Sequence, residues 1–321
     1  LEQAAESASG RPAALLEKDV WVVWAIDRMF RSEFGKSLVF KGGTSLSKAH
    51  RIIRRFSEDV DLTYDIRSLA PDLTPGGKVL PDNPSQEKKW TRLLRDRLAE
   101  WVATDVMTHL GDSLERERLR ARLDVTGEKI RLTYEPVIAA GGYVSQAVLL
   151  EFGGRSTGEP CNVIPIACDA ARWLPEVAFP TAEPRVMYAE RTFWEKATAI
   201  HVFCMKGRFA GTDRYSRHWH DLARLDDAGV VERALADGAL ASEVAAHKSA
   251  FFAEKDSKGD RIDYRAAVSG SLRLVPEGQP RVDLAADYEL MLDAGLLVED
   301  AETFDVLIDR CGSIERRANE T

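Results

Sequence analysis

The sequence predicts an α/β fold with a mixed sheet, followed by a mainly helical C-terminal lobe. The first half of the chain alternates helical stripes with short strand-like runs, several of which end in glycine. Prolines punctuate the connection between Pro160 and Pro184, and beyond Tyr188 nearly every periodic segment has helical spacing. Because such a change of character is typical of separate structural layers, we expect an α/β lobe over residues 1–180 and a helical lobe over residues 181–321.

Length and composition are those of a globular protein with a large core. The chain has 321 residues, of which 45% are hydrophobic and 30% are charged, and a typical domain has only about 100–200 residues. The formal net charge of −8 excludes general adhesion to polyanions but allows a local basic groove. Each arginine cluster by itself is more typical of a solvated helical face than of a ligand site. The clusters are Arg51, Arg54 and Arg55; Arg116, Arg118, Arg120 and Arg122; and Arg208, Arg214 and Arg217.

Cysteine spacing and hydropathy exclude several further classes. The four cysteines lie far apart without a CxxC pair, so the sequence predicts neither a zinc site nor a disulfide framework. No run reaches the about 18 apolar residues of a membrane span, and residues 1–12 lack a signal-peptide pattern. We therefore expect a cytoplasmic protein without a membrane partner.

The expected elements follow from hydrophobic spacing, caps and turn residues. The N-terminal lobe should contain a helix over 14–34, a strand over 37–40, a helix from Thr44 or Ser45 to about Arg54, a strand over 56–64, a loop over 66–85, a helix over 86–102, and strands over 123–127, 129–137 and 143–155. The C-terminal lobe should contain helices over 189–203, 218–229, 231–253 and 284–296, and a last helix from about 302.

The glycine pair Gly42-Gly43 ends the first predicted strand and precedes a helix. A glycine turn lets backbone amides approach a ligand closely, and the helix N-terminus adds a partial positive charge. This combination suits phosphate, to which Thr44 and Ser45 could add hydroxyl donors. A plain strand-to-helix turn is the alternative interpretation of these residues.

The strand predicted over 56–64 has an acidic face. Strand alternation places Ser57, Asp59, Asp61 and Thr63 opposite Phe56, Glu58, Val60 and Leu62. Asp59 and Asp61 could therefore share hard divalent cations such as Mg²⁺ through their oxygens. An exposed edge strand can also carry acids harmlessly. The combination of a phosphate turn, a short helix and a strand with two carboxylates favours the functional interpretation.

These motifs resemble the nucleotidyltransferase core shared with DNA polymerase β, in which a Gly-Ser/Thr turn and a helix precede a strand bearing Asp-x-Asp. More closely, "FKGGTSLSK", "RFSEDVDL", "ERTFWEKATAIH", "RHWHDLARL" and "DYELML" resemble the AbiEii family of nucleotidyltransferase toxins. The resemblance runs from residue 39 to about residue 292. It implies a polymerase β-like α/β lobe and a helical lobe that completes the active-site cleft.

The resemblance also implies roles for single residues. Asp59 and Asp61 would bind Mg²⁺, or alternatively Mn²⁺, Lys196 would contact the triphosphate, and Asp221 would complete the site. The nucleotide-binding residues would be Gly42, Gly43, Thr44, Ser45, Ser57 and Lys196. Packing of apolar neighbours explains the helix around Lys196 equally well, and Asp221 could belong to a solvated helix start.

Polymerase-type sites use a third acid on a neighbouring strand. The resemblance therefore implies a third carboxylate in this chain. Glu151 in "AVLLEFGG" is the candidate for this catalytic and metal-binding carboxylate, since a lone acid between apolar neighbours is otherwise awkward. Glu151 departs from the usual Asp. Asp124 in "RLDVTG" is the competitor, and either residue could be an exposed strand position. His218 and His220 lack partners at metal-ligand spacing.

The function expected from the resemblance is that of a Mg²⁺-dependent toxin. It would transfer a nucleotide from a nucleoside triphosphate to RNA, at the 3′ acceptor end of transfer RNA, and so block translation in a type IV toxin–antitoxin or phage-defence system. A winged-helix antitoxin would be its partner, and arginines near 51–55 and 116–122 could guide the RNA backbone. The alternatives are transfer to a protein or small-molecule hydroxyl, and a non-catalytic nucleotide- or RNA-binding module.

Overall fold

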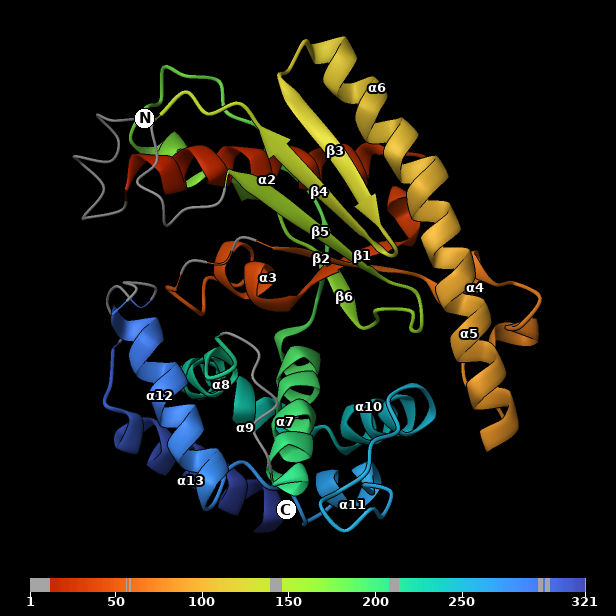
Figure 1. Cartoon of the computed structure of the whole chain (residues 1–321), viewed down its shortest axis with the longest axis vertical. Helices are drawn as coiled ribbons and strands as arrows, with labels where there is room; N and C mark the ends of the chain where they lie inside the picture. Colours follow the sequence, from red (N-terminus) through yellow and green to blue (C-terminus); the bar gives the residue numbers. More distant parts are fainter. Residues whose placement is uncertain are drawn as a thin grey trace. The chain divides into compact units, whose positions relative to one another are not determined.

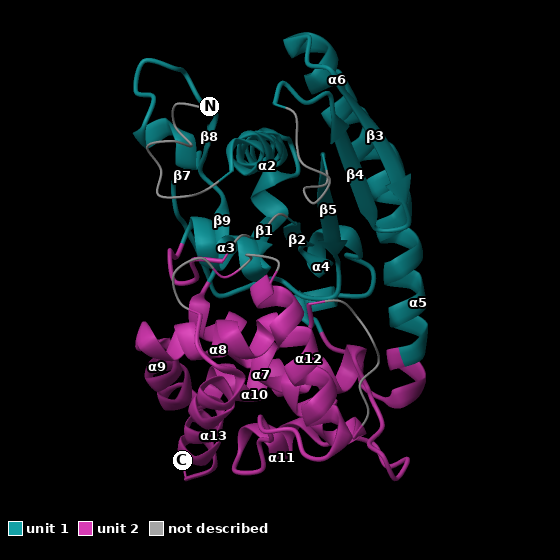
Figure 2. Ribbon diagram, turned by 60° about the vertical axis from the view of Figure 1, so that its left-hand side comes forward, with its two compact units in different colours: residues 1–49, 57–79, 88–187 teal, residues 50–56, 80–87, 188–321 magenta. Residues whose placement is uncertain are grey.

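The structure is a computed structural model that describes residues 12–55, 57, 59–138, 146–207, 214–293, 297 and 301–320. The chain divides into two compact units, which Figure 2 distinguishes by colour. Unit 1 consists of residues 1–49, 57–79 and 88–187, and unit 2 consists of residues 50–56, 80–87 and 188–321. The chain thus crosses between the units several times, and each unit is described by itself.

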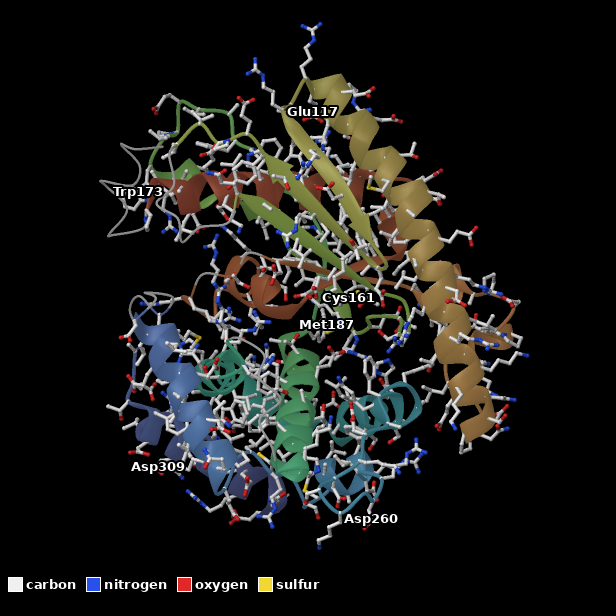
Figure 3. All side chains as sticks on the ribbon, in the orientation of Figure 1. Glu117, Cys161, Trp173, Met187, Asp260 and Asp309 are labelled. Atoms are coloured by element: carbon white, nitrogen blue, oxygen red, sulfur yellow. The ribbon has the colours of Figure 1, made fainter. Side chains whose placement is uncertain are left out.

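Unit 1 is built on a seven-stranded sheet in the order β3-β4-β5-β2-β1-β9-β6. The pairs β2–β5 and β1–β9 are parallel and the others are antiparallel, so the predicted mixed α/β fold is confirmed. The strands are β1 Leu38–Lys41, β2 Val60–Tyr64, β3 Ala121–Thr126, β4 Lys129–Tyr134, β5 Ala147–Gly153, β6 Cys161–Val163 and β9 Arg185–Met187. Cys161 and Met187, labelled in Figure 3, are register partners on β6 and β9.

Helices and a second, two-stranded sheet complete unit 1 (Figure 1). The helices are α2 Ala13–Arg31, α3 Gly42–Lys48, α4 Ile66–Leu69, α5 Pro84–Trp101, which begins within unit 2, and α6 Met107–Glu117. A π-helical turn over Val102–Val106 joins α5 to α6. The small sheet pairs β7 Ile166–Ala167 with β8 Thr181–Ala182, and single 3₁₀ turns lie at Gly35–Ser37, Pro75–Gly77 and Asp169–Arg172.

The two faces of the large sheet differ in chemistry. One face carries apolar side chains such as Phe40, Leu62 and Leu150, which are fully buried in a core that they share with residues of α2, α5 and α6. Because side chains alternate along a strand, the residues between them point to the other face. That face carries Asp61 on β2 and Glu151 on β5. One face of the sheet therefore positions the polar groups, and burial of the apolar side chains on the other face stabilises the fold.

Unit 2 is helical over the residues that the structure describes. Its helices are α7 Ala189–Lys206, α8 Arg217–Asp227, α9 Val230–Ala236, α10 Gly238–Phe251, α11 Tyr264–Val268, α12 Gln279–Asp293 and α13 Phe304–Glu320. Trp194 and Trp219 are buried in its core. Their indole N–H groups donate to the carbonyls of Ala234, at 3.1 Å, and of Leu274, at 2.7 Å, so the large rings are buried without leaving a donor unpaired.

Several predicted boundaries differ from the structure. The helix expected to reach Arg54 ends at Lys48, and Arg51 has a φ of 55°, which a helix cannot contain. The strand expected over 56–64 begins at Val60, while Phe56 and Glu58 lie outside the described residues. The expected loop over 66–85 contains α4 and a 3₁₀ turn, and the connection between Pro160 and Pro184 contains β6, β7 and β8.

Parts of two further predictions lie outside the described residues, namely 143–145 of the strand predicted over 143–155 and 294–296 of the helix predicted over 284–296. Among the helices that are described, none is both long and apolar enough to cross a membrane.

Candidate functional site

Gly42 and the carboxylate of Asp61 lie against each other in the predicted site. Gly42 begins α3 with a φ of 77°, and a Cβ atom built on it would lie 2.0 Å from Oδ2 of Asp61 and 2.7 Å from its Cγ. Asp61 is the register partner of Lys41, the residue before Gly42. The Asp61 carboxylate therefore occupies the space that any side chain at position 42 would need, and the glycine turn and the Asp-x-Asp strand fit each other.

The hydroxyl groups that follow the glycine pair bond within the chain. Thr44 is fully buried, and its Oγ1 lies 2.9 Å from Ser57 Oγ and 2.5 Å from the carbonyl oxygen of Asp59. Ser45 is also fully buried, and its hydroxyl donates to the Gly42 carbonyl at 2.9 Å. Both hydroxyls thus secure the backbone of the turn and of the segment that carries Asp59.

Glu151 lies beside Asp61 in the sheet. The two residues are register partners in the parallel pair of β2 and β5, so their side chains leave the same face of the sheet. Glu151 Oε1 pairs with Lys129 Nζ at 2.5 Å. The hydrogen bond to Glu151 raises the pKa of Lys129, partial burial opposes the rise, and the charges of Glu151 and Asp59 add to it. Lys129 therefore supplies positive charge beside the predicted acids.

Asp124, the competing third acid, lies elsewhere. It is on β3, where it faces Arg131 of β4, and β3 is two strands away from β5 in the sheet order. Its exposed carboxylate pairs with Arg122 at 3.1 Å. The structure thus places Glu151 next to Asp61 and does not place Asp124 there.

The donor set around Asp61 fits a magnesium ion that also binds substrate. In the described part of the chain, no group of three or more His, Cys, Asp or Glu side chains is gathered closely enough to hold a metal. Mg²⁺ is commonly bound through one or two carboxylates together with substrate phosphates and water, rather than by an all-protein cage. Asp59 and Asp61 supply hard oxygen donors of this kind, while the Glu151 carboxylate is engaged by Lys129.

Lys196 and Asp221, both in unit 2, form one buried ion cluster with Arg55. Asp221 on α8 is fully buried, and its Oδ2 lies 2.9 Å from Nζ of Lys196 on α7. Arg55 binds the same carboxylate with two parallel hydrogen bonds, from Nε at 2.7 Å and from Nη2 at 2.8 Å. Paired hydrogen bonds of this geometry fix the position of both partners. Neither Lys196 nor Asp221 is a solvated surface residue.

Burial and charge shift the proton equilibria of this cluster. Burial alone would raise the pKa of Asp221, but the charges of Arg55 and Lys196 hold it well below its usual value. Burial lowers the pKa of Lys196, and the charge of Asp221 opposes this. The His218 ring, whose Nδ1 lies 3.5 Å from Lys196 Nζ, also has a pKa well below its usual value because of burial and of that neighbouring cation. His218 is therefore neutral beside two cations and an anion.

The arginines near 51–55 were expected either to form a solvated helical face or to guide an RNA backbone. Arg55 instead is buried on Asp221, a pairing that the sequence did not predict. The only signal in the sequence was the position of Arg55 directly before the "FSEDVDL" motif. Its partner is 166 residues away along the chain, which no local pattern shows.

A second buried ion cluster fixes α3 within unit 1. Lys48 at the end of α3 pairs with Asp19 of α2 and, at 2.8 Å, with Asp169. Asp19 also accepts a hydrogen bond from the Asp169 amide at 2.6 Å. Burial raises the pKa of Asp19, and the charge of Lys48 opposes this. The helix that begins with the glycine pair is thus tied at its far end to α2 and to the turn at Asp169.

A mixed sheet that sets Asp61 against a glycine turn is the arrangement expected of a nucleotidyltransferase core. The chain belongs to the family of nucleotidyltransferase AbiEii toxins of type IV toxin–antitoxin systems, whose family model matches residues 24–310. It is therefore a nucleotidyltransferase toxin, which confirms the resemblance seen in the motifs. Membership implies a nucleoside triphosphate substrate and an antitoxin partner.

Comparison with solved structures finds a similar chain in MenT4, a nucleotidyltransferase toxin from Mycobacterium tuberculosis H37Rv. The sequence identity is 15%, the match covers 99% of this chain and 89% of that chain, and the TM-score is 0.49. Comparison with curated protein sequences finds no match.

Proposed function

We propose that this nucleotidyltransferase is Mg²⁺-dependent and adds a nucleoside monophosphate to the 3′ acceptor end of transfer RNA in the cytoplasm, which blocks translation. Family membership supports the reaction class. The observation that carries the assignment of the site is the placement of the Asp61 carboxylate, which lies against Gly42 on one side and beside Glu151 on the other. The same neighbourhood thus combines a glycine turn for phosphate with acids for metal.

Unit 1 would bind the nucleotide through its backbone. Amides at the start of a helix have no partner inside that helix, and those of Gly42, Gly43 and Thr44 begin α3. In this proposal they donate to phosphate oxygens, which carry the negative charge that a helix start favours. The buried hydroxyl of Ser45 holds the Gly42 carbonyl, and Ser57, bonded to Thr44, borders the nucleotide.

Asp59 and Asp61 would hold Mg²⁺, which when bound supplies positive charge to the reacting phosphates and to the attacking hydroxyl. In the reaction, the acceptor hydroxyl oxygen forms a bond to the α-phosphorus, the bond from that phosphorus to the bridging oxygen breaks, and pyrophosphate leaves. The hydroxyl proton must be accepted by a base. Glu151 is the candidate, since its carboxylate lies on the same sheet face as Asp61.

Lys196 would offset negative charge on the β- and γ-phosphates, a role that rests on the family motif. Its pairing with Asp221 at 2.9 Å supports the proposal, because burial lowers the pKa of Lys196 and the neighbouring carboxylate opposes that loss of charge. Asp221 in turn is held by Arg55. Asp221 therefore acts as the residue that positions both cations.

The winged-helix type of the antitoxin and a role in phage defence also belong to this proposal, and they rest on the family resemblance alone. We expect the neighbouring gene to encode the antitoxin. Co-expression of that gene should relieve growth arrest caused by the toxin, and arrest that persists would contradict this part of the proposal.

Transfer of radiolabelled nucleotide tests the proposed reaction. Each of the four nucleoside triphosphates, labelled at the α-phosphate, is incubated with Mg²⁺, total transfer RNA and the protein. We expect one or more to label RNA, and we expect Asp61→Asn and Lys196→Met to reduce labelling by about a thousandfold, the upper range for loss of a group that stabilises the transition state. Label in protein or small molecules instead of RNA would identify a different acceptor.

A matched pair of variants tests the choice of third acid. Glu151→Gln should slow transfer strongly, because it removes the base candidate beside Asp61. Asp124→Asn should transfer at the wild-type rate, because β3, which carries Asp124, is three strands away from β2, which carries Asp61. Both substitutions remove one negative charge from a strand of the same sheet. The reverse pattern would assign the role to Asp124, and wild-type rates for both would exclude a third acid from this face.

A further inference from the structure

The polar face of the large sheet continues from the acids onto β4. Lys129 is the register partner of Glu151, and Glu151 is the register partner of Asp61, so these three side chains form one row on one face. Arg131 follows Lys129 by two residues on β4 and therefore points to the same face. Figure 1 shows β3, β4 and β5 side by side. Adjacent strands lie about 4.8 Å apart, so the backbone of β4 is about 10 Å from that of β2.

Arg131 is the cation of β4 that can bind a ligand without breaking an interaction of the fold. Its side chain is exposed, and it forms no ion pair with the residues that the structure describes. Asp124, the register partner of Arg131 on β3, is paired with Arg122 at 3.1 Å. Lys129, the other cation of this face of β4, is paired with Glu151 at 2.5 Å.

The glycine turn and β4 lie on opposite sides of Asp61. In the sheet order β4-β5-β2-β1, β5 and β4 follow β2 on one side, and β1 on the other side leads directly into Gly42 and α3. With the phosphates of the nucleoside triphosphate at the glycine turn, the leaving pyrophosphate lies toward β1. In an in-line displacement the attacking oxygen approaches from the side opposite the leaving group. The acceptor hydroxyl therefore comes from the side of β5 and β4.

We propose that Arg131 binds the phosphate of the acceptor's terminal nucleotide, the nucleotide whose 3′ hydroxyl attacks the α-phosphorus. This inference rests on the proposed function and names the group by which the acceptor is recognised, a phosphodiester next to the reacting hydroxyl. A guanidinium group binds phosphate oxygens through two parallel hydrogen bonds, which fixes the orientation of the nucleotide.

Leu149 provides an apolar surface between this cation and the acids. It is the register partner of Arg131 on β5, it is partly exposed, and it points to the same face as Glu151 two residues later. The sugar of a terminal nucleotide fits such a surface, because its phosphate and its 3′ hydroxyl lie at two different ends. A protein hydroxyl has no phosphate in this position, so Arg131 favours a nucleic acid acceptor over a protein.

Removal of the charge from either partner tests the proposed contact. Transfer RNA is assembled by ligation with a neutral methylphosphonate between its last two nucleotides, and a control RNA carries the methylphosphonate four linkages earlier. Wild type is compared with Arg131→Gln, with Arg131→Lys, and with Arg265→Gln, which removes an exposed cation from unit 2. The measured quantities are kcat/KM for RNA, KM for the nucleoside triphosphate, and the urea midpoint of each variant.

We expect the terminal methylphosphonate to lower the wild-type kcat/KM for RNA about tenfold, which corresponds to about 1.4 kcal/mol. Arg131→Gln should lower kcat/KM for natural RNA by a similar factor and become insensitive to the methylphosphonate. Arg131→Lys keeps the charge and should retain most of the rate, while Arg265→Gln and the control RNA should match wild type. An unchanged methylphosphonate effect in Arg131→Gln, or a raised KM for the nucleoside triphosphate alone, would overturn the inference.

Equilibrium binding of the same RNAs without nucleoside triphosphate separates this inference from the proposed function. If wild type labels no RNA with any nucleotide, but its affinity depends on the last phosphate only when Arg131 is present, the proposed reaction is wrong and the inference stands. If wild type labels RNA and the rate does not depend on the last phosphate, the inference is wrong and the reaction stands. If wild type neither labels nor binds these RNAs, both are wrong.

Discussion

At position 42 a single hydrogen atom leaves room for the carboxylate of Asp61. We predict that Gly42→Ala lowers nucleotide transfer by about a hundredfold or more, the size of losing one preorganised group, because the methyl group would fall 2.0 Å from Asp61 Oδ2. The left-handed backbone adds a stability cost of about 1 kcal/mol. Transfer is measured under saturating nucleotide, and stability is measured by urea unfolding.

Gly127→Ala is the matched control for this prediction. Gly127 has a φ of 57°, and a Cβ atom built on it meets nothing within 4 Å. It should therefore show the same backbone strain and a similar loss of stability, while transfer stays at the wild-type rate. Equal activity losses in the two variants would show that strain, and not the collision with Asp61, explains the effect of Gly42→Ala.

Removal of Arg55 should destabilise unit 2 strongly, because Arg55 is paired with the buried Asp221 carboxylate. Arg55→Met takes one of two cations from a fully buried carboxylate, and breaking a buried pair in this way costs about 3–5 kcal/mol. Because the lowered pKa of Asp221 contributes stability only while pH stays above the folded-state pKa, the variant should also begin to lose stability at a higher pH than wild type. Arg265→Met, at an exposed position, is the control. Free energies of unfolding from urea titrations at pH 7 that differ by less than about 1 kcal/mol between Arg55→Met and wild type would contradict the assigned pairing.

At the scale of elements, α3 is fixed by ions at one end and carries the glycine turn at the other. We predict that Lys48→Met destabilises unit 1 by about 3–5 kcal/mol, since it leaves the buried Asp19 carboxylate without its cation. The double variant Asp19→Asn/Lys48→Met should recover most of that loss, because the buried Asp19 charge is gone and the carboxylate that remains, Asp169, is partly exposed. A double-mutant cycle by urea unfolding measures this, and strictly additive costs would rule out the direct pairing.

Element types were predictable from the sequence where hydrophobic periodicity was strong. The helix around Trp24, the strand around Leu62 and the helix around Trp194 all formed, because each buries the apolar face that the pattern shows. The end of α3 was not predictable, since the residues after Lys48 leave the helix and Arg55 pairs with Asp221 at a sequence distance of 166. Long-range ion pairs of this kind override local helix propensity.

The contacts of the candidate site could be predicted from the sequence only where the residues lie within one motif. Gly42 and Asp61 lie within one compact motif, so their contact could be anticipated, whereas the choice between Glu151 and Asp124 depended on strand order. Sheet register settles which acid is adjacent to Asp61, and strand order is a property of tertiary structure. The hydroxyls of Thr44 and Ser45 looked like phosphate donors in the sequence, but burial commits them to the chain.

The whole molecule has a net charge of −8, which has the same sign as the charge of its polyanionic substrates. Two cations are concentrated inside unit 2, where Lys196 and Arg55 pair with the buried Asp221 carboxylate. General attraction of the whole surface to nucleic acid is weak for such a protein, so RNA binding would depend on local groups of cations. The salt dependence of RNA binding would thus report on the cations that contact phosphates more than on the total charge.

Unfolding at different pH values tests the buried histidines of the molecule. His201 is buried in α7, and its Nδ1 accepts a hydrogen bond from the Arg273 amide at 3.1 Å. Burial, helped by the charge of Arg273, lowers the pKa of His201 from 6.5 to about 4. The unfolded chain therefore binds a proton between these pH values that the folded chain does not, so stability falls as pH falls from about 6.5 to about 4.

We predict that His201 alone accounts for a loss on the order of 3 kcal/mol over that interval, and that His201→Asn, which keeps an acceptor but cannot titrate, flattens the curve by this amount. His218, whose pKa is also lowered, continues to contribute in both proteins. Asp19 acts in the opposite direction because its pKa is raised, but it is common to both and cancels in the comparison. Urea unfolding from pH 7 to pH 4 gives the two curves, and curves that stay parallel throughout would show that His201 is not held neutral by the fold.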